Sequence, residues 1–310
     1  MQQPLIYIIL VNFNGASDTL ACLESLKKIN YSNFETIVID NGSADVNKLE
    51  NQCTLIKTHQ NLGFAEGNNV GIRYALAKGA EGILLLNNDT VVDADLLNAF
   101  ARNMIQCPIM GAKLYLYDDP TRFDHLGGYW NPKIAYFDRI AVRELDDKQR
   151  FETLTEVDYV CGASMFVRSD VFKRIGLLHS DYFLYWEESD FCMRAKRAGF
   201  TVWICPDAIV SHKDGASISG GKPFITYFDF RNRLLWIERN CTKRERLKAL
   251  AFVIFPIAFK LYRHRALKHL QLLIRPSEAK RSELKYIRAA LCGIKDYAYR
   301  RFGNSKTNLV

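Results

Sequence analysis

The first hundred residues alternate short apolar runs with longer amphipathic runs, and this alternation constrains the fold more than any other feature. Val, Ile and Leu dominate the short runs, as they do in buried parallel strands, at residues 5–11, 36–39, 54–57 and 82–86. Apolar residues recur every three or four positions in the segments 19–29, 64–78 and 94–105, as they do in helices. Alternating strands and helices predict an α/β fold with a mostly parallel sheet flanked by helices.

Polar clusters follow three of these predicted strands, at residues 12–15, 40–43 and 87–89. In open α/β sheets, ligands bind beyond the carboxyl ends of the strands. The order of the clusters therefore predicts a binding site along one edge of the sheet.

Two of the loops suit a nucleotide. Asp40 can accept hydrogen bonds from a base or a ribose, although Asp-Asn-Gly-Ser is also common turn chemistry. The segment 61–69 joins a strand to a helix and contains Asn61 and Gly63. Glycine allows close approach of a backbone, and a helix N-terminus attracts phosphate. An ordinary glycine-containing turn would have the same sequence.

The cluster Asn87-Asn88-Asp89 is a candidate metal site. One carboxylate with amide oxygens can hold Mg²⁺ or Mn²⁺, while diphosphate oxygens and water complete the coordination. A turn with Asp89 as a capping residue is the alternative. His212 lies after a later predicted strand and can ligate a metal, but a single histidine is more often structural.

Three carboxylates occur within residues 187–190, directly after the aromatic run 182–186. Desolvation and mutual repulsion make a carboxylate in such a setting a better proton acceptor, so Glu188 or Glu187 could deprotonate a sugar hydroxyl. Acidic residues are also favoured in the first turn of a helix. Further on, Arg231 lies among aromatic residues, and its planar fork suits a diphosphate unless it faces solvent.

The last third of the chain carries the positive charge. From Lys222 onward there are 21 Lys and Arg against 6 Asp and Glu, whereas the preceding part has 21 against 28. The apolar run 249–259, broken by Pro256, is much shorter than the roughly 20 residues that span a bilayer. Apolar stripes with basic flanks are typical of helices lying in a membrane interface. We therefore expect a catalytic domain over 1–240 and a helical, basic, membrane-associating region over 241–310.

Cysteine usage and the N-terminus indicate the compartment. The eight cysteines include no Cys-x-x-Cys pair, so we expect no zinc site. The apolar run 5–11 has no basic segment before it and no small-residue cleavage site after it, so we expect no secretory signal. Reduced thiols in a cytoplasmic protein, peripheral at the inner face of the cell membrane, are the simplest expectation.

Taken in order, the clusters resemble glycosyltransferase family 2, and within it the rhamnosyltransferase-like branch. The resemblance covers roughly residues 5–240 and rests on the ordered set Val11-Asn12-Phe13-Asn14, Asp40-Asn41-Gly42-Ser43, Asn61-Leu62-Gly63-Phe64, Asn87-Asn88-Asp89, Trp186-Glu187-Glu188, His212 and Arg231-Asn232. It implies a GT-A fold and an inverting, single-displacement transfer of a sugar from a nucleoside diphosphate. The donor would be dTDP- or UDP-linked, with dTDP-rhamnose favoured, and the acceptor a saccharide.

The resemblance also implies roles for individual residues. Asp40 would contact the nucleotide base or ribose, Asp89 would hold Mg²⁺ or Mn²⁺, and His212 would complete the metal shell. Asn87 stands where the family's Asp-x-Asp sequence has its first acidic residue. Glu188 aligns with the base, where Asp is usual, and Glu187 is a rival. The other candidates for binding the nucleotide sugar are Asn12, Asn61, Gly63, Asn88, Arg231 and Asn232.

Three alternatives compete with this prediction. A nucleotidyltransferase would carry Arg and Lys in a glycine-rich N-terminal loop, and residues 12–18 contain neither. A non-catalytic sugar-binding or scaffold protein would explain Asn87, but Asp89, Glu188 and His212 together argue against it. Nucleic-acid binding fits the basic tail, yet the apolar run 249–259 suits a membrane better. The acceptor we expect is therefore a lipid-linked saccharide in envelope polysaccharide assembly, such as the O-antigen of lipopolysaccharide.

Overall fold

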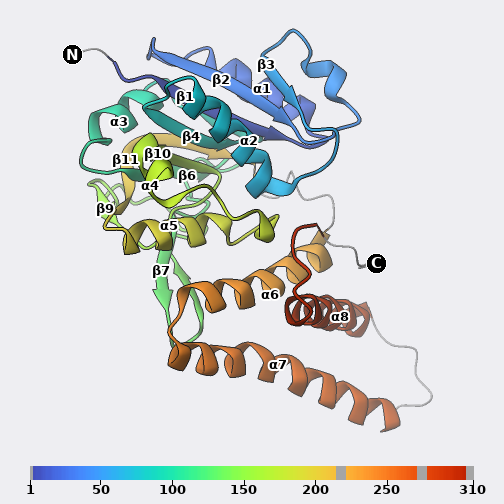
Figure 1. Cartoon of the computed structure of the whole chain (residues 1–310). Coiled ribbons are helices and arrows are strands. Elements are labelled where there is room, and N and C mark those ends of the chain that lie inside the picture. The colour runs from blue at the N-terminus through green and yellow to red at the C-terminus, as the bar shows by residue number, and fades with distance from the viewer. Residues whose placement is uncertain (1–2, 214–220, 271–277, 305–310) are drawn as a thin grey trace. The chain divides into compact units, whose positions relative to one another are not determined.

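The computed structural model describes the backbone of residues 3–213, 221–270 and 278–304, and it forms two compact units (Figure 1). The first unit comprises Met1–Tyr129, Asp138–Phe183 and Glu187–Ser217. The second unit comprises Trp130–Phe137, Leu184–Trp186 and Ile218–Val310. The chain therefore enters the second unit three times.

A nine-stranded mixed sheet forms the centre of the first unit. Its order is β3-β2-β1-β4-β10-β6-β11-β5, with β9 paired to β11. The strands β1 to β4 are parallel, β6 and β11 are parallel to each other, and β10 is antiparallel to both of its neighbours. This architecture confirms the predicted α/β class. The strands are β1 (Ile6–Asn12), β2 (Phe34–Asp40), β3 (Thr54–Lys57), β4 (Gly82–Asn87), β5 (Thr90–Val92), β6 (Ile109–Leu116), β9 (Thr155–Glu156), β10 (Ser164–Arg168) and β11 (Val202–His212).

Helices cover both faces of the sheet because side chains alternate along each strand. Ile6, Ile8 and Leu10 of β1 belong to a core cluster that also contains residues of α1 and α3. On the other face, α2 packs on β1, β2 and β4. The helices of this unit are α1 (Ala16–Leu26), α2 (Gly63–Ala77), α3 (Leu96–Asn103), α4 (Ser169–Ile175) and α5 (Glu187–Arg197), with short 3₁₀ turns at Val46–Leu49 and Ser180–Tyr182.

The segment 109–160 is more regular than its sequence indicates. We expect irregular strands and loops there, but β6 is a continuous strand of eight residues, seven of them buried. A separate two-stranded hairpin follows, formed by β7 (Gly128–Asn131) and β8 (Tyr136–Arg139). Because both faces of β6 are buried, its sequence lacks the alternation of apolar and polar residues that marks a half-exposed strand.

Three helices make up most of the second unit: α6 (Gly221–Asn240), α7 (Lys243–Leu270) and α8 (Glu278–Ala298). α6 packs closely against α8, and a Cβ at Gly293 would lie 2.5 Å from the carbonyl oxygen of Tyr227. Trp236 of α6 contacts Trp130, Phe137 and Trp186. These contacts join the segments Trp130–Phe137 and Leu184–Trp186 to α6. Because this unit already contains all of α6, the domain boundary expected at residue 240 falls inside it.

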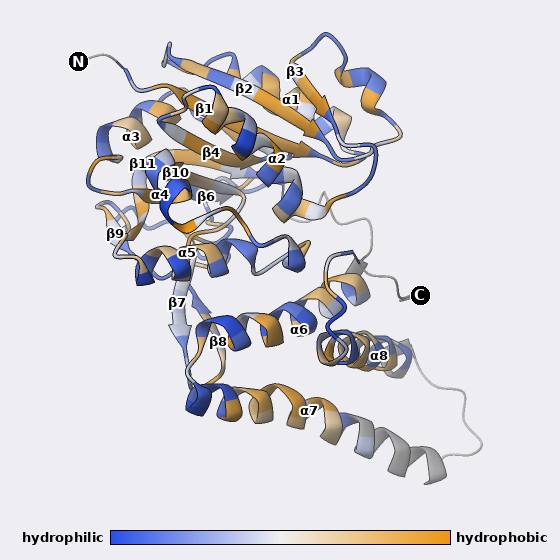
Figure 2. Ribbon diagram, viewed as in Figure 1, coloured by the Kyte–Doolittle hydropathy of each residue, from blue (hydrophilic) through white to orange (hydrophobic). Residues whose placement is uncertain are grey.

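Helix α7 continues through Pro256 and presents two apolar faces. Ala249, Val253 and Ile257 are buried, with the four-residue spacing of one helix face. Further apolar side chains point to solvent, and Figure 2 shows the resulting run of apolar residues along the middle of α7. They are Leu247, Phe252, Ile254, Phe255, Phe259 and Tyr262. Within the described ranges, none of the helices combines the length and the apolar character needed to cross a membrane.

Candidate active site

The carboxyl ends of β1 and β2 meet through a direct side-chain contact. Asn12 and Asp40 are partners in the parallel register, and Asn12 Nδ2 donates to Asp40 Oδ1 at 2.9 Å. The other carboxylate oxygen of Asp40 accepts from the backbone N–H of Ser43 at 3.0 Å. Each carboxylate oxygen can accept a second hydrogen bond. Asp40 thus has the acceptor capacity that a base imide or a ribose hydroxyl requires, at the strand end where the sequence predicts it.

The loop before α2 is held by its own side chains and by Phe183. Asn61 Oδ1 accepts from the N–H of Gly63 at 2.8 Å and from Asn41 Nδ2 at 3.2 Å. Gly63 has φ +80°, and a Cβ there would lie 2.4 Å from the carbonyl oxygen of Phe183. The same oxygen accepts from the N–H of Phe64 at 2.6 Å. The close approach that Gly63 permits is therefore made to Phe183, and nucleotide binding by Asn61 and Gly63 stays a prediction.

Asn88 ties the end of β4 to the start of α1. Its Nδ2 donates to Thr19 Oγ1 at 2.9 Å and lies 3.4 Å from Asn12 Oδ1. Asn12 Oδ1 also accepts from the Thr19 hydroxyl at 2.9 Å. This buried network fixes the strand ends that carry Asp40 and Asp89, so Asn12 and Asn88 orient their neighbours.

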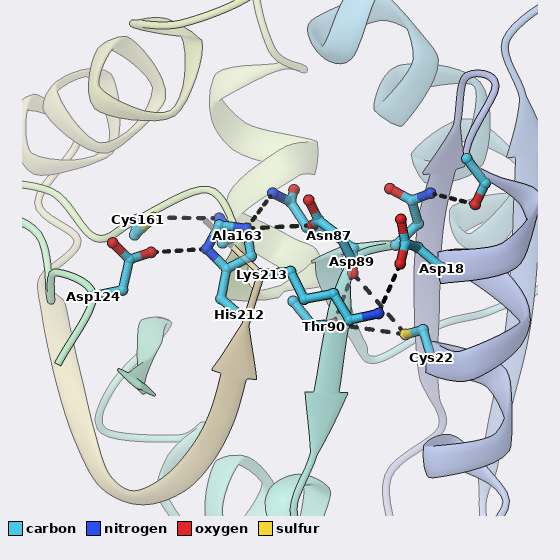
Figure 3. A network of polar contacts seen from close by, with 12 residues as sticks. Asp18, Cys22, Asn87, Asp89, Thr90, Asp124, Cys161, Ala163, His212 and Lys213 are labelled. Carbon is cyan, nitrogen blue, oxygen red and sulfur yellow. Dashed lines mark hydrogen bonds and ion pairs between the residues drawn. The ribbon is translucent and has the colours of Figure 1, made fainter. Parts of the chain in front are cut away.

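Asp89 and His212 face each other, although 123 positions separate them in the sequence. His212 ends β11, where it pairs with Thr90 of β5, and its Nε2 lies 3.3 Å from Asp89 Oδ1 (Figure 3). Asn87 Nδ2 lies 3.3 Å from the same ring nitrogen. The other ring nitrogen, Nδ1, lies 2.7 Å from Asp124 Oδ2. The structure thus brings together the two predicted metal ligands and adds a second carboxylate.

The protonation of His212 and the charges of the two carboxylates beside it depend on one another. Burial opposes protonation of His212, but hydrogen bonds to Asp124 and Asp89 outweigh it and raise the pKa of His212 to about 10. Burial alone would raise the pKa of Asp124, yet hydrogen bonds with His125 and His212 hold that pKa well below its usual range. The two carboxylates thus favour the protonated form of the His212 ring. A divalent cation bound by Asp89 and His212 would replace that proton.

This donor set suits Mg²⁺ or Mn²⁺ with few protein ligands. One carboxylate and one imidazole leave the remaining positions to diphosphate oxygens and water, as hard cations accept. Across the described ranges, no group of three or more His, Cys, Asp or Glu side chains is arranged to hold a metal by itself. A cation held by Asp89 and His212 would take its remaining ligands from the phosphate oxygens of a nucleotide and from water.

The acidic residues at the start of α5 differ in their surroundings. Asp190 is fully buried and accepts from the Tyr182 hydroxyl at 3.0 Å and from Arg194 Nε at 2.9 Å. Glu187 is also buried, whereas Glu188 is partly exposed. A catalytic base must contact a substrate that enters from solvent, so the greater exposure of Glu188 favours it over Glu187 as the base.

Two features mark the neighbourhood of Glu188. Phe183, Tyr185 and Trp186 have φ of 65°, 67° and 77°, a region that costs non-glycine residues of order 1 kcal/mol or more and that recurs at active sites. Next, the N–H of Asn87 donates to the carbonyl of Ala163 at 2.9 Å. A Cβ at the preceding Gly162 would lie 3.7 Å from Glu188 Cβ. Gly162 and Ala163 thus contact both the end of β4 and Glu188.

Arg231 and Asn232 lie in the second unit. Arg231 is fully buried, donates to the carbonyl of Gly303 at 2.6 Å, and stacks 4.7 Å from the Phe228 ring. Asn232 Nδ2 donates to the carbonyls of Leu184 and Tyr185 at 2.7 and 3.0 Å. The solvent-facing alternative is wrong for Arg231. A contact of these two residues with a diphosphate stays a prediction.

Sequence reasoning missed two residues of the cluster, Asp124 and Lys213. Lys213 donates its backbone N–H to the carbonyl of Asp89 at 3.0 Å, and its ammonium lies 2.7 Å from Asp18. It follows His212 directly, so its neighbourhood could have been inferred. Asp124 lies in a segment without a recognisable pattern, and only the fold reveals it.

A mixed α/β sheet with polar side chains and a carboxylate at the ends of its strands is the architecture of glycosyltransferases with the GT-A fold. The model of the family described as "Glycosyl transferase family 2" matches residues 7–176, more than half of the chain. The chain belongs to this family.

Three relatives are about a quarter identical to the chain over the residues that align. The "Low-salt glycan biosynthesis hexosyltransferase Agl10" of Haloferax volcanii is 26% identical over 250 residues, covering 74% of each protein. The "dTDP-rhamnosyl transferase RfbF" of Shigella flexneri is 24% identical, covering 76% of this chain and 80% of that protein. The "Rhamnosyltransferase WbbL" of Escherichia coli is 26% identical over 46% of this chain and 58% of its own length.

Solved structures support the fold. The mannosyltransferase PcManGT from Pyrobaculum calidifontis, solved with GDP-Man and Mn²⁺, superposes with a TM-score of 0.55 at 13% identity, covering 97% of this chain and 89% of that one. GalNAc-T7, solved with UDP, GalNAc and Mn²⁺, gives 0.57 at 12% identity, covering 76% of this chain and 48% of that one. At this identity the likeness shows the GT-A fold alone.

Proposed function

We propose that this protein is a metal-dependent, inverting glycosyltransferase that moves a hexose from a nucleoside diphosphate to a saccharide acceptor. The observation that carries the proposal is the facing pair Asp89 and His212, 3.3 Å apart at the sheet edge where Asn12 and Asp40 also end their strands. Such a pair suits a cation that holds a diphosphate next to a bound nucleoside.

The residues divide the reaction between them. Asp40 accepts hydrogen bonds from the nucleoside, and Asp89 with His212 would hold Mg²⁺ or Mn²⁺. When bound, the cation neutralises negative charge on the departing diphosphate. A carboxylate oxygen of Glu188 takes the proton of the acceptor hydroxyl. The hydroxyl oxygen then bonds to the anomeric carbon as the bond to the diphosphate oxygen breaks on the opposite face, which inverts the configuration.

Relatives support a choice of donor. Two of the three named relatives are rhamnosyltransferases by name, and one of these is named for dTDP-rhamnose. We propose dTDP-rhamnose as the donor, with a UDP-linked hexose as the second candidate. The acceptor we propose is a lipid-linked saccharide in envelope polysaccharide assembly, as for an O-antigen.

Helix α7 supports a contact with anionic phospholipid at the cytoplasmic face of the membrane. Its solvent-facing apolar residues include Phe255 at 70% and Phe259 at 55% exposure. No acidic residue occurs between Glu245 and Glu278, while Lys and Arg recur through that stretch. Exposed apolar side chains with basic neighbours suit binding in the plane of a negatively charged interface.

A nucleotide-release assay tests the proposed activity. The full chain is given dTDP-rhamnose, UDP-glucose or GDP-mannose with Mn²⁺, and free nucleotide is measured. We expect release from dTDP-rhamnose that is lost in Asp89→Ala and Glu188→Gln but kept in Glu50→Gln, which alters an exposed ion pair on the same unit. Release that persists without Mn²⁺ would remove the metal from the proposal. Failure of all three donors to bind would favour a scaffold protein.

Liposome co-sedimentation tests the membrane contact. We expect the full chain to pellet with vesicles containing anionic phosphatidylglycerol, and Phe255→Ser/Phe259→Ser to stay in the supernatant. Ile105→Ser, at an 82% exposed apolar side chain of the first unit, is the matched control. Equal pelleting of the double variant and the wild type would contradict a membrane-binding role for α7.

A further inference from the structure

Asp124 is a buried carboxylate whose position is fixed by the backbone around it. Its N–H donates to the carbonyl of Leu114 in β6 at 2.8 Å, and its own carbonyl accepts from the N–H of Arg143 at 3.1 Å. The residue is 8% exposed. Two hydrogen bonds to separate segments hold this backbone in place, so the carboxylate has little freedom to move away from His212.

The two nitrogens of His212 face different partners. Nδ1 lies 2.7 Å from Asp124 Oδ2, while Nε2 faces Asp89 Oδ1 and Asn87 Nδ2, each at 3.3 Å (Figure 3). A carboxylate accepts hydrogen bonds and cannot donate them, so Nδ1 must carry the hydrogen. When the ring is neutral, the lone pair therefore resides on Nε2, on the side of Asp89.

We propose that Asp124 is the positioning residue of the cation site, and this inference rests on the proposed function. By accepting the Nδ1 hydrogen, Asp124 fixes both the orientation and the tautomer of the imidazole. Nε2 is then directed to the space beside Asp89 before a cation arrives. Histidine ligands of metals depend on such an acceptor behind the ring, and its removal weakens metal binding about 10- to 100-fold.

A purely structural role for Asp124 makes a different prediction. His125 Nδ1 lies 3.6 Å from Asp124 Oδ1, so the carboxylate could serve only to balance a second, partly buried histidine. In that case, replacing Asp124 would lower stability and leave the cation affinity of the folded protein unchanged. Cation affinity therefore distinguishes the two roles.

The experiment measures Mn²⁺ binding to the full chain in the presence of dTDP, from the electron paramagnetic resonance signal of free Mn²⁺. Asp124→Asn keeps the shape and one acceptor oxygen but loses the charge, and we expect several-fold weaker binding. Asp124→Ala loses the acceptor, and we expect a loss of about 10- to 100-fold. Asp207→Asn, an exposed carboxylate on the same strand as His212, should bind Mn²⁺ as the wild type does.

Two further results distinguish a failure of the positioning role from a failure of the metal site itself. Wild-type Mn²⁺ affinity in folded Asp124→Asn, together with weak binding in His212→Ala, would overturn the positioning role and leave the metal site intact. Wild-type affinity in both His212→Ala and Asp89→Ala would instead refute the metal site of the proposed function. Should Asp124→Ala not fold, the comparison of Asp124→Asn with Asp207→Asn still decides, because both keep the side-chain volume.

Discussion

Asp190 accepts a hydrogen bond from Arg194 at 2.9 Å, one turn further along α5. The guanidinium also donates to the carbonyls of Ile175 and Leu177, both at 2.8 Å, and so ties α5 to the segment that ends α4. Asp190 is thereby committed to the fold, which separates it in role from the two glutamates that precede it.

Removing this charge should lower stability strongly. In Asp190→Asn, Arg194 keeps its half-buried charge without its carboxylate, and breaking such a buried pair costs about 3–5 kcal/mol. Urea unfolding measures the change. Glu24→Gln, in an exposed pair with Lys27, should change the free energy of unfolding by less than about 1 kcal/mol. If Asp190→Asn also lowered the free energy of unfolding by less than about 1 kcal/mol, the structural role of Asp190 would be wrong.

Two glycines with similar backbones allow a second prediction. Gly63 and Gly79 have φ of +80° and +83°, but only Gly63 has a neighbour that a Cβ would strike, at 2.4 Å. Gly79→Ala should cost about 1–2 kcal/mol from the backbone alone. Gly63→Ala adds a clash with Phe183 and should cost about 1–3 kcal/mol more. Thermal unfolding compares the two variants, and equal losses would show that the loop yields easily.

Acid should weaken a carboxylate contact in the first unit. The Tyr115 hydroxyl and Lys148 ammonium lie 2.5 and 2.6 Å from Asp146 Oδ2. Burial would raise the pKa of Asp146, but these hydrogen bonds outweigh it and lower the pKa to about 2. The folded value lies below the unfolded value of about 3.9, so the contact stabilises fully above that pH and is lost as the pH falls toward 2.

The variant Asp146→Asn tests this pH dependence. Its free energy of unfolding should be roughly 1–2 kcal/mol below that of the wild type at pH 6, and the two should converge near pH 2. Urea titrations at both pH values give the comparison. A gap that does not change with pH would show that the charge of Asp146 contributes nothing.

The two glutamates of α5 should separate in kinetics. Glu188→Gln removes the proton acceptor and should lower kcat by about 10²- to 10⁴-fold with the donor KM nearly unchanged. Glu187→Gln, at a buried side chain, should affect stability more than kcat. Nucleotide release measures kcat, and thermal unfolding measures stability. The reverse pattern would assign the base to Glu187.

Local sequence patterns were sufficient for the parallel strands β1 to β4 and the polar clusters that follow them, because strand and polar cluster lie within a few residues of each other. The end of β2 at Asp40 and the end of β4 at Asn87 lie where the apolar runs stop. The partnership of Asp124 with His212 could not be predicted, since 88 residues separate the two and nothing near Asp124 signals a ligand. Such contacts depend on which strands become neighbours, and that order is a property of the whole sheet.

At Asp40 and Gly63 the sequence allows both a structural and a binding interpretation, and the structure is compatible with both. The turn chemistry at Asp40 is present, since Ser43 N–H donates to its carboxylate, yet the same carboxylate keeps acceptor capacity at the sheet edge. The glycine at 63 does allow close approach, but to a protein carbonyl. Residue type limits what a side chain can do, whereas its partner is set by packing.

The second unit is built from three separate segments of the chain, and this has a consequence for its folding during synthesis. Trp130 and Phe137 leave the ribosome about a hundred residues before Trp236, the α6 side chain on which they pack. At about 5–20 residues per second, Trp236 is synthesised about 5–20 s after these two aromatic residues. A chain truncated before α6 would expose Trp130 and Phe137 without Trp236 to pack on. We therefore expect such truncated forms to aggregate.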